Sequence, residues 1–342
     1  MSERSGKVQT VLGLIDPSEL GHTQPHEHLL VNLIPAPQRD GAVGEEIRMD
    51  NLGWNRRHWT SNPENLRLTS EEDAIKELED YKAAGGGAMA ELSIIGIDRD
   101  PEAYGRVSKA SGVHVVMGAG YYTSAYHPPE VESMSEEELA KVMVRDVVEG
   151  TEGTGIKSGI IGEIGLDWPV HDNEAKVLRA AARAQRETGA SLNIHPGRNP
   201  AAPLDAIRIV HDAGGDPERT VMSHMDRTLF NFNAMLDLAK TGCYLEWDLF
   251  GQESSYYPLA PIDMPNDHTR IDCIMKFIEA GFRNKLLISQ DICTKIHTMK
   301  FGGEGYGHIL KNILPMMKQK GMSDEDIEAL TIKNPARVLT FL

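Results

Sequence analysis

Short apolar runs that end in polar residues recur along the chain, and most of them follow a stretch with the spacing of an amphipathic helix. The Ala- and Arg-rich stretch at 174–187, for example, precedes an apolar run at 190–195. Near-continuous apolar runs of this length are typical of strands buried on both faces, as in a parallel sheet. The pattern predicts strands at 26–32, 87–93, 113–120, 158–164, 190–195, 220–224, 243–247 and 285–290.

Eight strands that alternate with helices predict an α/β fold, the (β/α)8 TIM barrel. We expect a single domain over residues 1–342 that begins with a short strand or hairpin at 7–14. A doubly wound open sheet is the alternative, but no GxGxxG motif follows the first strand. The glycines at 85–87 precede a strand, so we interpret them as a helix end rather than a phosphate loop.

Two long irregular stretches, 35–64 and 251–268, would follow strands on the same face of such a barrel. Loops of this length in a compact domain are often lids over a functional site. The pattern therefore places the candidate site at that face, without indicating which loop closes.

Composition narrows the class of protein. The chain of 342 residues has 35 Lys and Arg against 51 Asp and Glu, a formal net charge of −16. This balance argues against nucleic acid and anionic membranes as partners. No apolar stretch approaches the roughly 20 residues of a membrane helix, and the polar N-terminus shows no secretory signal. Three cysteines without CxxC spacing suit a reducing compartment, so we expect a cytoplasmic protein.

The first predicted strand carries the strongest chemical signal, His26-Glu27-His28. Residues at i and i+2 of a strand point to the same side, so both imidazoles can bind one metal ion. Glu27 would then point the opposite way, toward the helices. Two unrelated histidines, one capping and one packed, are the alternative reading of so short a motif.

Other strand ends strengthen the metal hypothesis. In a barrel, the carboxyl ends of the strands are where catalytic groups gather. A single histidine at a strand end is more often a core residue. Here, however, six residues of metal-binding types stand at the ends of predicted strands, which chance alone explains poorly. Imidazoles and carboxylates suit zinc, or iron, manganese or cobalt. We expect two divalent ions, the first held by His26, His28 and Asp291, the second by His195 and His224, with Glu163 placed to bridge them.

These motifs resemble those of the phosphotriesterase-like group of the amidohydrolase superfamily. The segments HEH, HPGR, SHMDRT and SQD stand in that group's order, and the resemblance extends nearly from end to end. Stretches such as SGIIGEIG and CYLEWDLFG are most similar to animal members that hydrolyse N-acetyltaurine to taurine and acetate. The resemblance therefore implies an amidohydrolase with two metals and a small anionic N-acyl substrate. A homodimer is common for this type of barrel.

Two departures from the group's pattern affect this expectation. Many relatives bridge the metals with a carboxylated lysine, and Glu163 occupies that place here. Lactonase relatives carry an arginine after strand seven, where this chain has Leu249. Their strand-three tyrosine is present as Tyr122, a candidate substrate contact. The bridge is therefore retained, whereas lactone and phosphotriester hydrolysis become less expected.

Such a site suggests a mechanism. Two metals about 4 Å apart hold a hydroxide at neutral pH, which would be the nucleophile. Asp291 would act as general base and then as general acid toward the leaving group. Esters, lactones, amides and phosphate esters all fit this chemistry, so a lactonase, esterase or phosphotriesterase is the alternative. A metal-binding protein that has lost catalysis is a third hypothesis, against which the complete ligand set argues.

Three cations follow strands five, six and eight at the same mouth, namely Arg198, Arg227 and Lys295. Guanidinium groups recognise oxyanions such as sulfonates and carboxylates. We therefore expect these residues to contact the anionic end of the substrate. The alternative is that they pair with acids such as Asp205 or Asp226.

Overall fold

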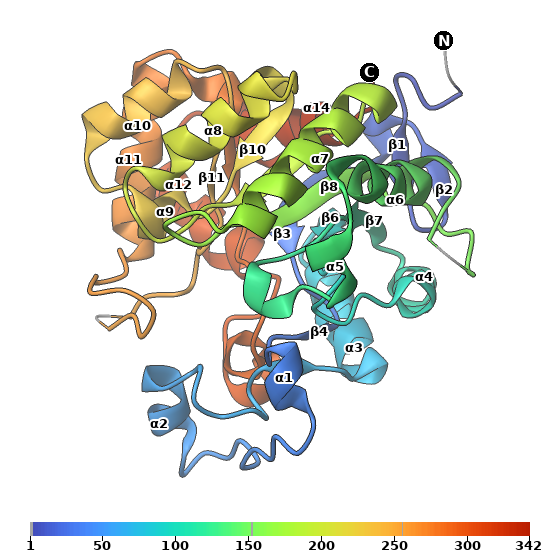
Figure 1. Ribbon diagram of the computed structural model, residues 1–342. Coiled ribbons are helices and arrows are strands. Elements are labelled where there is room, and N and C mark those ends of the chain that lie inside the picture. The colour runs from blue at the N-terminus through green and yellow to red at the C-terminus, as the bar shows by residue number, and fades with distance from the viewer. Residues whose placement is uncertain (1–2, 152, 255) are drawn as a thin grey trace.

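The computed structural model describes residues 3–151, 153–254 and 256–342. Eight strands form a nearly closed parallel barrel, with each strand beside the next one along the sheet (Figure 1). They are β3 (His22–Glu27), β6 (Gly86–Glu91), β7 (His114–Ala119), β8 (Ile160–Gly165), β9 (Leu192–His195), β10 (Thr220–Met222), β11 (Tyr244–Trp247) and β12 (Leu286–Ile288). The amide of Asp291 donates to the carbonyl of His26 at 3.3 Å and so joins the last strand to the first. The predicted (β/α)8 barrel is confirmed.

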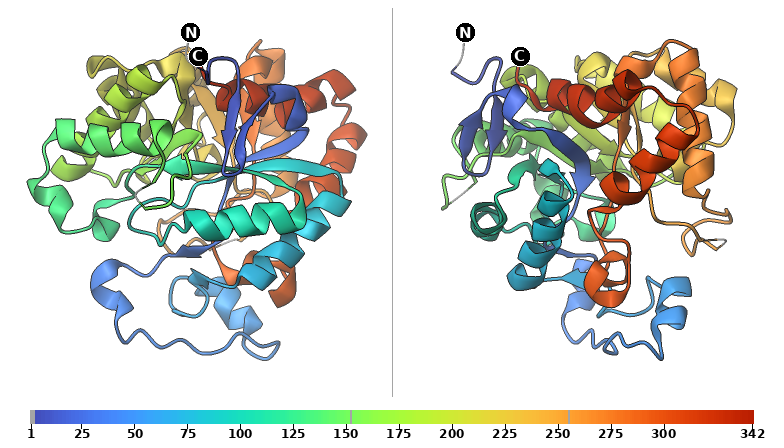
Figure 2. Two further views of the ribbon diagram at one scale, coloured as in Figure 1. Left: turned by 90° about the vertical axis from the view of Figure 1, so that its right-hand side faces the viewer. Right: turned by 180° about the vertical axis from the view of Figure 1, so that it is seen from behind.

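Helices connect the strands and cover the outside of the barrel (Figures 1 and 2). Their starts follow ordinary capping chemistry: Ser70 caps α3, and Ser135 with Glu138 forms a capping box at α6. The connecting helices are α3 (Glu71–Ala83), α4 (Pro101–Ser111), α6 (Glu136–Val148), α7 (Asp172–Thr188), α8 (Ala202–Asp212), α10 (Phe232–Ala239) and α11 (Asp267–Glu279). After β12 come α12 (Leu314–Gln319), α13 (Asp324–Glu328) and α14 (Asn334–Leu339).

The first barrel strand starts earlier than its predicted range. It spans His22–Glu27, although these residues are largely polar in sequence, and all of them are buried. The apolar residues that led to the prediction lie just outside the barrel, where β4 (Val31–Asn32) pairs antiparallel with β5 (Arg67–Leu68). A prediction based on apolar residues therefore placed this strand too late in the sequence. The residues that form the strand are largely polar, and the barrel nevertheless buries them. His28 lies one residue beyond the strand.

Different segments of the chain lie at the two ends of the barrel. At one end, the predicted hairpin is present as β1 (Val8–Thr10) and β2 (Gly13–Ile15). The amide of Gly6 donates to Phe341 there at 2.9 Å, so the two termini lie together (Figures 1 and 2). At the other end, the loop after β4 carries the short helices α1 (Ala36–Arg39) and α2 (Leu52–Arg57). Two more short helices are α5 (Glu130–Ser133) and α9 (Met225–Thr228).

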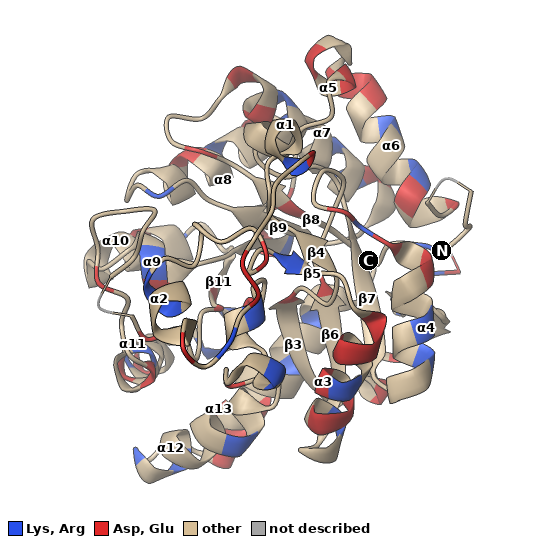
Figure 3. Cartoon of the chain, turned by 90° about the horizontal axis from the view of Figure 1, so that it is seen from below, with Lys and Arg blue, Asp and Glu red and all other residues tan. Residues whose placement is uncertain are grey.

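The outer surface carries much of the negative charge. Asp and Glu gather on the outer helices α3, α5 and α6 (Figure 3). None of the helices in the described ranges is long and apolar enough to cross a membrane. The acidic excess thus lies on outer helices rather than only at the barrel mouth.

Candidate active site

All six candidate metal ligands meet at the carboxyl end of the barrel. They are His26 in β3, His28 just after it, Glu163 in β8, His195 at the end of β9, and His224 and Asp291 just beyond β10 and β12. Five of them are buried, whereas 14% of the Asp291 side chain remains exposed. Asp291 is therefore the most exposed of the six candidate ligands.

The first predicted ligand group is assembled around Asp291. Nε2 of His28 lies 3.1 Å from Asp291 Oδ1, and Nε2 of His26 lies 3.8 Å from the same oxygen. Glu163 approaches both rings, at 3.6 Å from His26 Nε2 and 3.7 Å from His28 Nε2. Two imidazole nitrogens and two carboxylates thus surround one point, as a divalent cation requires.

The second group shares Glu163 with the first. Oε1 of Glu163 lies 2.5 Å from Nδ1 of His195 and 2.8 Å from Nε2 of His224. The two ring nitrogens are 2.9 Å apart. Glu163 therefore lies between the two groups, and its role as a metal bridge stays a prediction.

The opposite ring nitrogens have partners that orient three of the imidazoles. Nδ1 of His28 meets the Ser93 hydroxyl at 2.9 Å. Nδ1 of His26 lies 3.1 Å from Glu246, and Nδ1 of His224 lies 2.8 Å from Asp248. Carboxylate or hydroxyl partners of this kind fix the tautomer and leave Nε2 for a metal.

The donor set fits a pair of divalent ions. Nε2 of His26 is buried and has no hydrogen-bond partner within the described residues, as expected for a nitrogen meant for a cation. Burial lowers the pKa of His195 well below its usual value, and Arg227 adds to this effect. Burial opposes ionisation of Glu163, but His195 and His26 outweigh it and hold the pKa of Glu163 well below its usual range. Burial opposes protonation of His26, His28 and His224, but neighbouring carboxylates outweigh it and raise the pKa of all three rings. A metal ion binds the neutral imidazole, so it would replace a proton at these rings.

The sequence analysis did not identify the residues that orient these imidazoles, namely Ser93, Glu246 and Asp248. Ser93 follows β6 at a strand end, and Glu246 and Asp248 alternate along the end of β11. The i, i+2 spacing that singled out the first-strand histidines also applies to this acidic pair. Nothing in the sequence, however, indicated that the pair would face imidazoles rather than cations.

A cavity of about 470 Å³ opens above the ligand cluster. Both long loops contribute to its wall, which supports their interpretation as lids. The first supplies Pro35, Gln38, Trp59, Ser61 and Pro63, and the second supplies Gln252, Tyr257 and Leu259. His195, His224 and Asp291 form part of the lining, so a bound molecule would contact the candidate ligands directly.

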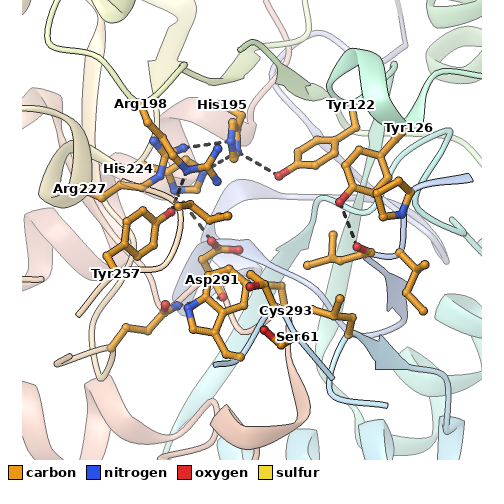
Figure 4. Close-up of a pocket in the computed structure, with 18 of the residues that line it drawn as sticks. Ser61, Tyr122, Tyr126, His195, Arg198, His224, Arg227, Tyr257, Asp291 and Cys293 are labelled. Carbon is orange, nitrogen blue, oxygen red and sulfur yellow. Dashed lines mark hydrogen bonds and ion pairs between the residues drawn. The ribbon is translucent and has the colours of Figure 1, made fainter. Parts of the chain in front are cut away.

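Two arginines line this cavity without carboxylate partners. Arg198 donates through Nε to the Tyr257 hydroxyl at 2.9 Å. Arg227 is buried, and its guanidinium donates to the carbonyl of Pro196 at 3.2 Å and to Thr228 at 3.2 Å. No ion pair joins either arginine to an acid within the described part of the chain. Figure 4 shows both guanidinium groups beside Tyr257, on the side of the pocket opposite Tyr126.

The acids proposed as alternative partners are occupied elsewhere. Asp205 pairs with Arg208. Asp226 receives a 2.8 Å hydrogen bond from Arg270, which is fully buried on α11. Arg227 is therefore not neutralised by its sequence neighbour.

Tyr122 and Leu249 both reach the cavity wall. The Tyr122 hydroxyl lies 3.2 Å from Nδ1 of His195. Burial raises the pKa of Tyr122 well above its usual value, so the hydroxyl stays protonated and can donate. Leu249 packs with Tyr257 and Met264 and gives this part of the wall an apolar surface.

Lys295 is the one predicted substrate contact that the structure does not bring to the cavity. Its ammonium group forms an ion pair with Glu64 and lies over the Phe301 ring, 5.8 Å from the ring centre. Glu64 is distant in sequence, so this partner could not be inferred from local spacing. Among the three predicted cations, the unpaired ones that line the cavity are Arg198 and Arg227.

Known proteins resemble the whole chain. The profile of the Phosphotriesterase family matches residues 6–339. An N-acetyltaurine hydrolase from Homo sapiens is 46% identical over 348 aligned residues, which cover all of both chains. A resiniferatoxin-binding protein from Rhodobacter sphaeroides superposes with a TM-score of 0.92 at 33% identity, over 99% of this chain and 98% of that one. A lactonase from Listeria monocytogenes superposes with a TM-score of 0.82 at 25% identity, over 98% of this chain and 99% of that one.

Proposed function

Since the chain belongs to the phosphotriesterase family, we propose that it is a two-metal amidohydrolase that cleaves N-acetyltaurine and other small N-acyl taurines. The products are taurine and a carboxylate, acetate in the case of N-acetyltaurine. Full-length similarity to N-acetyltaurine hydrolases of several animals supports this choice of substrate. One observation carries the proposal. Arg198 and Arg227 line the cavity beside the candidate metal ligands, and neither forms an ion pair with a carboxylate of the described residues.

The metals would be held by two ligand groups with a shared carboxylate. His26, His28 and Asp291 would hold the first ion, His195 and His224 would hold the second, and Glu163 lies between the two groups. Zinc suits this mixture of nitrogen and oxygen donors, and iron, manganese or cobalt are alternatives. When bound, such ions lower the pKa of a water molecule and polarise the carbonyl of an amide.

Asp291 performs the proton transfers in this scheme. Its carboxylate reaches the cavity beside His28, so it can accept a proton from the attacking water. It then delivers that proton to the amide nitrogen, because an unprotonated amide nitrogen is a poor leaving group. The Tyr122 hydroxyl, protonated and directed at the ligand cluster, donates a hydrogen bond to the oxygen that gains charge.

The two arginines orient the substrate. A sulfonate offers three oxygens to guanidinium donors, which bind oxyanions strongly in a partly dehydrated cavity. Like charges held near one another at Arg198 and Arg227 also favour an anion between them. With the sulfonate at this side, the amide of a short N-acyl taurine lies over the metal ligands.

The test measures taurine release together with metal content. Purified protein loaded with zinc or manganese is incubated with N-acetyltaurine, and in parallel with N-acetylglycine and a simple lactone. We expect about two metals per chain and turnover of N-acetyltaurine well above that of the other two compounds. A preparation with two metals that releases no taurine would overturn the substrate assignment.

A lactonase or esterase is the second candidate, favoured by the similarity to the Listeria lactonase. The same ligands and Tyr122 would serve it equally well. Leu249 and the two arginines argue for an anionic amide instead, because a neutral lactone has no group for an arginine clamp. Turnover of the lactone without turnover of N-acetyltaurine would select this candidate.

A further inference from the structure

Asp291 has a backbone conformation that residues other than glycine seldom adopt. Its φ angle is +49°, in the left-handed region, where an L side chain crowds its own backbone. Such a conformation at a functional residue persists only where the surrounding groups hold it. Side chains from two different elements surround the backbone of residues 290–292 here.

Glu27 holds this segment from the barrel side. It lies between His26 and His28 at the end of β3 and is fully buried. One carboxylate oxygen accepts from the amide of Gln290 at 2.7 Å, and the other accepts from the amide of Ile292 at 2.9 Å. The two amides that flank Asp291 therefore end on one carboxylate.

Glu27 has one further hydrogen-bond donor at the end of β12. The Ser289 hydroxyl donates to Glu27 at 2.7 Å. No ion pair involves Glu27 in the described part of the chain, so backbone and hydroxyl donors are what balance its charge. The donors at the end of β12 supply what a buried carboxylate requires, and the sequence did not indicate them.

Gln252 holds the same segment from the loop side. Its side-chain amide donates to the carbonyl of Gln290 at 2.9 Å and to the carbonyl of Asp291 at 3.2 Å. The backbone of Gln252 is itself fixed, because its carbonyl accepts from the buried Arg270 at 2.9 Å. The carbonyls around Asp291 are thus held by one side chain and the amides by another.

We propose that Glu27 and Gln252 are positioning residues that keep Asp291 in its left-handed conformation and so direct its carboxylate at the first ligand group. The proposal rests on the role proposed for Asp291. Without these contacts the backbone would relax toward a more favourable φ angle, and the carboxylate would turn away from His28. Both residues act through Asp291 and touch neither substrate nor metal.

The contrary reading is that Glu27 only fastens β12 to β3. In that case its loss would lower thermal stability and loosen the whole cluster. The proposed role instead predicts a defect confined to the ion that Asp291 helps to hold. Release of metal to a coloured chelator separates these outcomes, since it reports on each site without any substrate.

The principal variant is Glu27→Gln, which keeps the side-chain size but places an amide group against one backbone donor. We expect one phase of metal release to become about tenfold faster or more, while the phase from His195 and His224 stays as in wild type. With substrate, kcat should fall about tenfold while KM changes less than about twofold. Asp291→Asn should accelerate the same phase, which identifies it.

Gln252→Leu tests the loop side and does not depend on the folding of the Glu27 variant. It removes both donors, and we expect the same release phase to become about threefold faster or more. The control is Glu77→Gln, another buried glutamate, which lies in α3 and accepts from the amide of Lys300 at 3.3 Å. Its release phases should match those of wild type.

Two results would overturn the proposal. One is equal acceleration of both phases in Glu27→Gln, which would indicate general loosening. The other is wild-type release and wild-type kcat in Gln252→Leu. Absence of turnover on N-acetyltaurine in the wild-type protein would overturn the proposed substrate, but the release phases would still decide whether Asp291 is positioned in this way.

Discussion

The guanidinium of Arg227 donates to Nε2 of His195 at 3.0 Å, and the opposite nitrogen of that ring faces Glu163 at 2.5 Å. One imidazole therefore joins the arginine pair at the cavity wall to the candidate metal ligands. Arg198 makes no such contact and bonds to Tyr257 instead. The two arginines, similar in charge and location, should differ in what their removal does.

Arg198→Met should weaken binding of an anionic substrate without affecting the metals. A charge-assisted hydrogen bond contributes about 1.5–3 kcal/mol, so KM for N-acetyltaurine should rise by about tenfold or more. For an uncharged N-acetyl amine the rise should stay below about threefold. Steady-state kinetics on the two compounds makes the comparison, and equal rises would rule out a direct charge contact.

Arg227→Met should show the same selective rise in KM and, in addition, altered metal retention. Loss of its donor changes the environment of His195, so the second ion should be released to a chelator at a different rate than in wild type. Elemental analysis and timed chelation measure this. Wild-type retention in Arg227→Met would mean that the contact to His195 has no influence on the metal.

Lys295→Met provides the matched cation control for both variants. Because Glu64 already neutralises Lys295 outside the cavity lining, its removal should change KM for N-acetyltaurine less than about threefold. A rise equal to that of Arg198→Met would instead restore Lys295 as a substrate contact, as its position after strand eight suggests.

Asp291→Asn should leave the fold intact and lower kcat by about two orders of magnitude or more, the scale of general acid–base effects. The amide can still accept a hydrogen bond but cannot take up the proton. Kinetics with N-acetyltaurine gives the loss, and circular dichroism confirms folding. Turnover within about threefold of wild type would remove Asp291 from the proton transfers.

Glu163→Ala should lose at least one metal ion. Its carboxylate lies between both ligand groups, so neither group keeps its full set of donors without it. Elemental analysis of the purified variant measures the loss. Retention of two ions per chain would refute the bridging role, whereas His114→Gln, which changes a partly exposed histidine at the other end of a strand, should retain both.

The pH dependence of stability should contain a contribution from Glu77. Burial raises the pKa of Glu77 to about 7, above the value of 4.5 for an unperturbed group. The folded state therefore binds this proton more tightly. The resulting stabilisation is complete below pH 4.5 and is lost as the pH rises through about 7.

Glu77→Gln should remove this contribution. Relative to wild type, the variant should gain stability at pH 8 and gain little at pH 4.5. Urea unfolding across this range measures the free energy of unfolding for both proteins. A parallel decline of the two curves would show that another group is responsible.

Strand ends could be predicted well because a parallel barrel buries near-continuous apolar runs and places polar residues directly after them. This logic located His195 and His224 and placed Glu163 between the ligand groups. It failed at β3, where the residues before His26 are polar yet buried. Hydrophobicity reports average burial, and it cannot identify a strand whose polar side chains are satisfied by partners far along the chain.

The remaining site features depend on contacts between distant segments. The pairing of Lys295 with Glu64, and of Asp226 with Arg270, decides which cations stay free, and neither pair has a spacing visible in the sequence. The same holds for Gln252, whose amide reaches Asp291 across a loop. Sequence gives the chemical groups at each strand end, whereas the partners of those groups follow from the folded arrangement.

The cavity wall and the ligand cluster come from separate parts of the chain. The cluster is built on barrel strands, whereas much of the wall comes from the two long loops, around Trp59 and around Tyr257. Sequence changes in these loops can therefore alter which molecules enter the cavity while the candidate metal ligands stay the same. In evolutionary terms the barrel supplies a reusable reaction centre, and changes in the two loops, together with the arginines after β9 and β10, can alter which substrate fits.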